Sequence, residues 1–113
     1  MRVDRELMRG AGPVAVLKLL DGGPKYGYEL IESLARLSDG VLAMGHSTLY
    51  PLLYNLEAQG QIRGQWRDEG SPRPRKYYTL TAKGKKRLAH DVGQWRAVAD
   101  AMRGLGILQP APA

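Results

Sequence analysis

Apolar residues recur at helical spacing in four stretches of the chain. In each stretch Leu, Ile, Val, Ala or Met returns at every third or fourth position, which predicts amphipathic helices over about residues 4–20, 27–37, 45–59 and 82–103. Glycine and proline lie between these stretches, as expected of the turns that join helices. Pro13 lies inside the first stretch, and because proline lacks a backbone N–H we expect a kink or a break there.

Two shorter stretches have the composition of β-strands. Residues 61–67 alternate apolar or small side chains with Arg and Gln, and residues 76–80 are rich in Tyr and Thr. The segment DEGSPRPR between them, residues 68–75, contains Gly and Pro and predicts the tip of a hairpin. Residues 41–44 are a shorter candidate for a strand or an extended link.

The order of these elements is typical of one fold class. Three helices followed by a two-stranded hairpin form a winged helix-turn-helix, and here a long helix follows. The predicted fold is therefore mainly α with a small β-hairpin. We divide the 113 residues into a winged helix-turn-helix domain (1–81), a C-terminal dimerisation helix (82–104) and a flexible tail (105–113).

The third predicted helix has an unusual outward face. At about 100° per residue, four leucines fall within about 100° of arc and face the core: Leu49, Leu52, Leu53 and Leu56. The opposite face carries Ser47, Pro51, Tyr54 and Ala58, flanked by Thr48, Tyr50 and Asn55. Small, hydroxylated and uncharged side chains suit a helix that enters the major groove of DNA. Alternatively, Tyr50 and Tyr54 are half-buried boundary residues and Ser47 is a helix cap.

Pro51 raises a separate question, because it lies within this predicted helix. If the helix begins near residues 45–47, the proline falls in or just after the first turn, where few backbone donors have a partner to lose.

The net charge of +6 is concentrated in one segment. Residues 61–87 contain nine basic and two acidic side chains, a balance of +7, whereas residues 1–60 contain six basic and seven acidic ones, a balance of −1. At the predicted hairpin tip, Arg73, Arg75 and Lys76 lie around two prolines, where they can straddle a phosphate backbone or enter a minor groove. A solvated basic turn is the alternative interpretation.

Five apolar positions of the last predicted helix follow a 4-3-4-3 spacing. This is the spacing of a heptad seam, and it predicts a dimer interface through Leu88, Val92, Trp95, Ala99 and Met102. A seam of only about two heptads can also pack within its own domain. Both interpretations remain open on the sequence alone.

Several classes of function find no support in the sequence. The chain has no cysteine, which excludes disulfides, thiolate metal sites and cysteine nucleophiles. Its two histidines, His46 and His90, predict no metal site. We expect neither a cofactor nor enzymatic activity, because no paired carboxylates, nucleophile with a base or phosphate-binding loop is evident. No apolar run approaches the ~20 residues of a membrane span, and a secretory pattern is lacking, so we expect a cytoplasmic protein without a membrane partner.

Three segments resemble the hallmark segments of PadR-type transcriptional regulators, in the same order and at the same spacing. They are YGYEL (26–30), STLYPLLYNLEAQGQI (47–62) and RPRKYYTLTAKGKKRL (73–88). The resemblance covers about residues 5–103. It implies a homodimeric, DNA-binding repressor of the short subclass, in which one long C-terminal helix forms the dimer. The DNA contacts it implies are Ser47, Thr48, Tyr50, Arg73, Arg75 and Lys76.

The resemblance also implies a signal that releases the repressor. Some family members bind flat aromatic compounds between one Trp from each C-terminal helix, and Trp95 resembles that Trp. The sides of such a site would be lined by Leu7, Ala11 and Val14. Packing in the dimer core is the alternative role for Trp95. The expected partner is a near-palindromic, double-stranded operator. The alternative function is a winged-helix module that binds protein or RNA without operator specificity.

Overall fold

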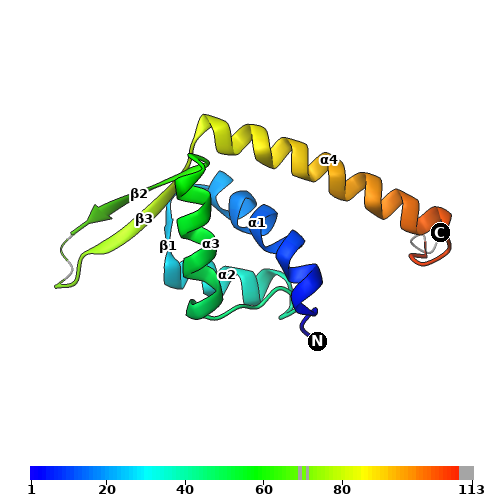
Figure 1. Cartoon of the computed structure of the whole chain (residues 1–113). Coiled ribbons are helices and arrows are strands. Elements are labelled where there is room, and N and C mark those ends of the chain that lie inside the picture. The colour runs from blue at the N-terminus through cyan, green and yellow to red at the C-terminus, as the bar shows by residue number, and fades with distance from the viewer. Residues whose placement is uncertain (69, 71, 110–113) are drawn as a thin grey trace.

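A computed structural model describes residues 1–68, 70 and 72–109 of the chain. It confirms the predicted winged helix-turn-helix with a long C-terminal helix. The elements shared with the prediction are α1 (Arg5–Asp21), α2 (Gly27–Leu37), α3 (His46–Ala58), β2 (Ile62–Arg67), β3 (Arg75–Leu80) and α4 (Ala82–Gly104). Figure 1 shows the β2–β3 hairpin, hereafter the wing, and α4 projecting away from α1, α2 and α3 on different sides. The molecule is therefore elongated, 52 × 29 × 27 Å.

The sheet has a third strand that the sequence pattern does not indicate. β1 (Lys25–Tyr26) pairs antiparallel with β3, so the strand order is β1-β3-β2. Two residues are too few for an alternating pattern to be recognised. This pairing places Tyr26 opposite Tyr77 and attaches the start of α2 to the wing.

Two local predictions left alternatives open, and the structure excludes one alternative in each. α1 continues through Pro13 without a break, because the missing N–H removes one hydrogen bond but the flanking turns remain helical. Residues 41–44 form no strand. The chain instead turns after α2, with positive φ angles at Asp39 (53°) and Gly40 (81°), and then runs without regular structure into α3.

One apolar core joins the four helices to the sheet. Its buried members are Val16, Leu17, Leu20, Leu30, Leu34, Met44, Leu49, Leu53, Leu56, Ile62, Tyr78 and Leu88. Leu88 fits the alternative interpretation of the predicted seam, because its side chain is only 7% exposed and packs within its own chain. The dimer interface through the other four positions stays a prediction. Val92 is partly buried against the same core.

The base of the wing and the start of α4 are in very close contact. Thr81 caps α4, as its Oγ1 accepts a hydrogen bond of 3.0 Å from the backbone N–H of Gly84. Gly84 is buried, and a β carbon there would overlap the carbonyl oxygen of Gln61 and lie 2.7 Å from Cδ1 of Leu80. Only glycine therefore lets α4 leave the sheet along this path.

The chain turns back at the C-terminal end of α4. The backbone N–H of Gly106 bonds to the carbonyl of Arg103 at 2.9 Å, and that of Ile107 bonds to Met102 at 2.8 Å. The predicted flexible tail over residues 105–113 is thus a turn at its beginning. Its last residues, 110–113, lie outside the described residues, and its flexibility remains a prediction.

Candidate nucleic-acid interface

Helix α3 presents one polar face to solvent. Ser47, Thr48, Pro51 and Tyr54 are exposed, and Tyr54 exposes 58% of its surface. The predicted core positions Leu49, Leu53 and Leu56 are buried, and Leu52 is partly buried. α3 begins at His46 without a side-chain cap and with no acidic residue in its first turn. Its positive N-terminal end is therefore not neutralised within the helix.

Pro51 lies just after the first turn of α3, as predicted for a helix that begins near residues 45–47. Because α3 begins at His46, Pro51 is beyond the first turn, and it cannot donate to the carbonyl of Ser47 four residues earlier. That carbonyl belongs to an exposed residue. It is thus an acceptor on the outward face of α3, beside the hydroxyl of the same residue.

Tyr50 has a structural role in addition to any contact with a ligand. It is half-buried against the core, as in the alternative interpretation of this position. Its hydroxyl lies against Gly27, where a β carbon would be 2.5 Å from the hydroxyl oxygen. His46 stacks on the Tyr50 ring at 5.7 Å between centroids, and Tyr54 lies 6.2 Å away on the other side. These rings form a continuous aromatic surface along α3.

The wing is fixed to α3 by one carboxylate. Glu57 accepts a 2.9 Å hydrogen bond from the backbone N–H of Gly64 and forms a 3.2 Å ion pair with the ammonium of Lys76. The hydrogen bond from Gly64 lowers the pKa of Glu57, and Lys76 acts in the same direction, against the effect of burial. Lys76 also lies 5.4 Å from the centre of the Tyr78 ring, and burial raises the pKa of that phenol to about 12. The DNA contact predicted for Lys76 stays a prediction, and its ammonium is already paired with Glu57.

Two arginines lie nearer the tip of the wing. Arg73 and Arg75 are both exposed, and the guanidinium of Arg75 lies over the ring of Tyr26 at 4.7 Å from its centre. Stacking of this kind limits the directions in which Arg75 can extend. Two residues of the predicted tip, Glu69 and Ser71, lie outside the described residues.

A cleft of about 280 Å³ separates α3 from the wing. It is lined by Tyr50 and Tyr54 from α3, by Tyr26 and Gly27 near the start of α2, and by five residues of the wing: Trp66, Pro74, Arg75, Lys76 and Tyr78. Trp66 is 66% exposed, although it lies on the same strand as the buried Ile62. Aromatic and cationic groups therefore face each other across this cleft.

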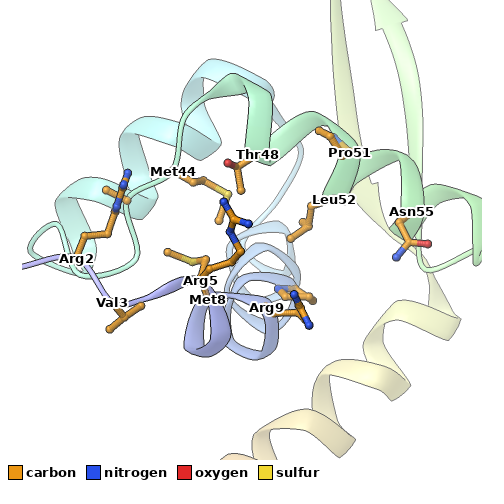
Figure 2. Close-up of a pocket in the computed structure, with 12 residues that line it drawn as sticks. Arg2, Val3, Arg5, Met8, Arg9, Met44, Thr48, Pro51, Leu52 and Asn55 are labelled. Carbon is orange, nitrogen blue, oxygen red and sulfur yellow. The ribbon is translucent and has the colours of Figure 1, made fainter.

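A larger cavity, of about 520 Å³, lies on the opposite flank of α3 (Figure 2). Its α3 wall consists of Thr48, Pro51, Leu52 and Asn55. The opposite wall comes from the N-terminal segment and α1, and includes Arg2, Arg5 and Arg9. The charge count does not single out these arginines, because residues 1–60 together contain six basic and seven acidic side chains, a balance of −1.

Comparison with known proteins identifies the family. Residues 16–90 match the family model described as the transcriptional regulator PadR-like family. The chain belongs to the PadR-like family of transcriptional regulators. It shares 40% identity with a PadR family regulator from Eggerthella lenta, with a TM-score of 0.76 over 88% of this chain and 85% of that one. A Streptococcus transcriptional regulator is 30% identical, with a TM-score of 0.79 over 91% and 99%. A transcriptional regulator from Clostridium thermocellum is 26% identical, with a TM-score of 0.80 over 88% and 96%.

As a member of the PadR-like family, the chain is a DNA-binding regulator. Its α3 and its wing are parts of the winged helix-turn-helix fold. Over residues 1–68, 70 and 72–109, no group of three or more His, Asp or Glu side chains could hold a metal ion. None of the described helices is long and apolar enough to cross a membrane.

In this PadR-like regulator, the predicted effector residues lie on one face shared by α1 and α4. Trp95 is 40% exposed, and its Cζ2 atom would be 3.9 Å from a β carbon on Gly10, so the indole rests on α1. Leu7 is 58% exposed, while Ala11 and Val14 are half-buried. The two cavities described above lie elsewhere, on either flank of α3.

Proposed function

We propose that this PadR-like regulator is a homodimeric, sequence-specific repressor that a signal releases from its operator. The observation that carries the proposal is the outward face of α3, which is exposed, uncharged and adjacent to a basic wing. A helix that only faces solvent normally carries Lys and Glu, whereas close approach to base edges requires small hydroxylated residues and apolar contacts for thymine methyl groups.

Each element of the surface has a distinct role in the proposal. Ser47, Thr48 and Tyr54 supply hydroxyl groups to base edges or phosphates, and the ring of Pro51 supplies an apolar contact. Arg73 and Arg75 contact the phosphate backbone or enter the adjacent minor groove. Tyr50 contributes an edge of its half-buried ring. Lys76 acts indirectly, by holding the wing to Glu57.

The dimer forms through the C-terminal half of α4. The seam proposed here excludes Leu88 and consists of Val92, Trp95, Ala99 and Met102. Support comes from Val98, which is 46% exposed beside this seam, and from Leu105, which is 75% exposed at the end of the helix. Apolar surface of this extent on a projecting helix is costly in water unless a second copy covers it. A two-fold axis across α4 places two α3 helices about one turn of DNA apart, which requires a near-palindromic operator.

Release follows from the same geometry. A planar aromatic compound between the two Trp95 indoles, with Leu7, Ala11 and Val14 at the sides, would alter the angle between the α4 helices. Because α3 and α4 of each chain pack into one core, the distance between the two α3 helices of the dimer would change. The affinity for an operator with fixed half-site spacing would then fall.

Titration of the purified protein onto duplex DNA from its own promoter tests the function. We expect binding at least about 10³-fold tighter than to a random duplex of equal length at the same salt concentration. Equal affinity for the two duplexes would favour the protein- or RNA-binding alternative. Transcription from the same promoter in a reconstituted system then distinguishes a repressor, which lowers transcript yield, from an activator.

A further inference from the structure

The N-terminal part of the chain places three arginines beside α3, the helix proposed to contact the bases. Arg2, Arg5 and Arg9 line the 520 Å³ cavity, whose other wall is α3. Figure 2 shows the side chain of Arg5 extending from the start of α1 toward Thr48. Thr48 and Pro51, which belong to the proposed reading surface, line the same cavity. The arginines are therefore neighbours of that surface.

No carboxylate among the described residues forms an ion pair with these arginines. The residues that line the cavity include no Asp or Glu. In contrast, Arg36, Arg87 and Arg103 each pair with a carboxylate of their own helix. Arg5 also lies in the first turn of α1, where the positive end of the helix dipole disfavours a cation, although Glu6 in the same turn offsets part of this effect. An anion at this position would relieve both effects.

Local structure holds the arginines at this position. The backbone N–H of Val3 donates a 3.1 Å hydrogen bond to the carbonyl of Val41, which attaches the N-terminal segment to the turn after α2. Arg5 and Arg9 are four residues apart and so lie on the same side of α1. Gly12 lets α1 approach α3 closely, since a β carbon there would be 3.2 Å from Cδ1 of Leu52.

The cavity and the wing lie on opposite flanks of α3. Asn55 lines the arginine cavity and Tyr50 lines the cleft beside the wing, and the two positions are about 140° apart around the helix. Ser47, Pro51 and Tyr54 lie in the arc between them. A helix in the major groove has a sugar-phosphate backbone on each side, about 12 Å apart. The wing is directed to one of these backbones, which leaves the arginine side directed to the other.

We propose that Arg2, Arg5 and Arg9 form a second phosphate-binding surface, on the flank of α3 opposite the wing. This inference rests on the proposed function, because it assumes that α3 lies in the major groove. The arginines contact phosphate oxygens and no base edges. They raise affinity for all duplexes equally and fix the rotation of α3 in the groove, since backbone contacts on both flanks determine its orientation.

Salt dependence of DNA binding tests the second surface. Each phosphate contact contributes about −0.9 to the slope of log affinity against log salt concentration. We expect the double variant Arg5→Gln/Arg9→Gln to lower the magnitude of this slope by about 1.8 on both the promoter duplex and the random duplex. The ratio of the affinity for the promoter duplex to that for the random duplex should stay within about twofold of wild type. The variant Arg5→Lys/Arg9→Lys, which keeps the charges, is expected to keep most of the slope.

Lys18→Gln provides the matched control, because Lys18 is an exposed cation at the far end of α1 and does not line the cavity. Its slope should equal that of wild type, and circular dichroism should show that all variants are folded. An unchanged slope for Arg5→Gln/Arg9→Gln would overturn the inference, as would a loss of affinity for the promoter duplex alone. Failure of the proposed function looks different, because wild-type protein would then bind both duplexes equally.

Discussion

Two glycines of α4, Gly84 and Gly93, are expected to respond to the same substitution in opposite ways. Gly84 is buried, whereas a β carbon at Gly93 would have no neighbour within 4 Å among the described residues. Alanine relieves the helix penalty of glycine, about 1 kcal/mol in either case. At Gly84 the added methyl group overlaps the backbone of Gln61, and overpacking against a rigid neighbour costs about 1–3 kcal/mol, toward the upper end here because a main-chain oxygen cannot rotate away.

The net expectation is a loss of about 2 kcal/mol in the free energy of unfolding for Gly84→Ala and a gain of up to about 1 kcal/mol for Gly93→Ala. Urea unfolding followed by circular dichroism measures both, at one protein concentration because dimerisation would make the midpoint depend on it. A Gly84→Ala protein as stable as wild type would refute the inference that the close contact between α4 and the base of the wing requires glycine.

Three further outcomes follow from the site. Glu57→Gln should lower the free energy of unfolding by about 1 kcal/mol at pH 7. Because folding lowers the pKa of Glu57, this difference is fully present above the pKa of the unfolded state and disappears as the pH falls through the pKa of the folded state. Unfolding curves measured from neutral to acidic pH check it. Tyr54→Ala should weaken promoter binding about tenfold and leave the melting temperature unchanged, since Tyr54 is exposed, whereas His90→Ala on α4 should change neither. Trp95→Glu should give a monomer in sedimentation at micromolar concentration, while Gln94→Glu, on the other side of α4, should sediment like wild type.

The structure also shows which tyrosine of α3 is the better position for a mutational test of base recognition. Tyr50→Ala would remove a half-buried ring from the contact with Gly27, so a lower melting temperature would accompany any loss of binding. Tyr54 is less affected by this difficulty because 58% of its surface is exposed.

Features that depend on local periodicity could be predicted from the sequence. The burial of Leu49, Leu53 and Leu56 follows from helical geometry alone, and the Thr81 cap follows from its residue type just before α4. Dimerisation through Leu88 could not be decided in this way, because the same apolar spacing serves a partner helix or the helix's own domain.

Features that depend on long-range contacts could not be predicted. Glu57 and Lys76 are 19 residues apart, and no pattern within either segment indicates that they meet. Similarly, a charge count along the chain adds Arg2, Arg5 and Arg9 to their acidic neighbours, whereas in the folded chain these arginines line one cavity beside α3 whose lining includes no Asp or Glu. The local charge of the folded chain depends on which side chains lie together on one surface.

The contact between Gly27 and Tyr50 is one of the contacts that hold α3 close to α2. Because the Tyr50 hydroxyl occupies the space that a side chain at Gly27 would need, any other residue there must displace the Tyr50 ring or shift α3. The protrusion of α3 limits how deeply it can penetrate a groove and therefore which base edges its short side chains can reach. Evolution of a new binding preference thus does not require a change on the reading surface itself, since a substitution on α2, behind that surface, can alter which bases lie within range.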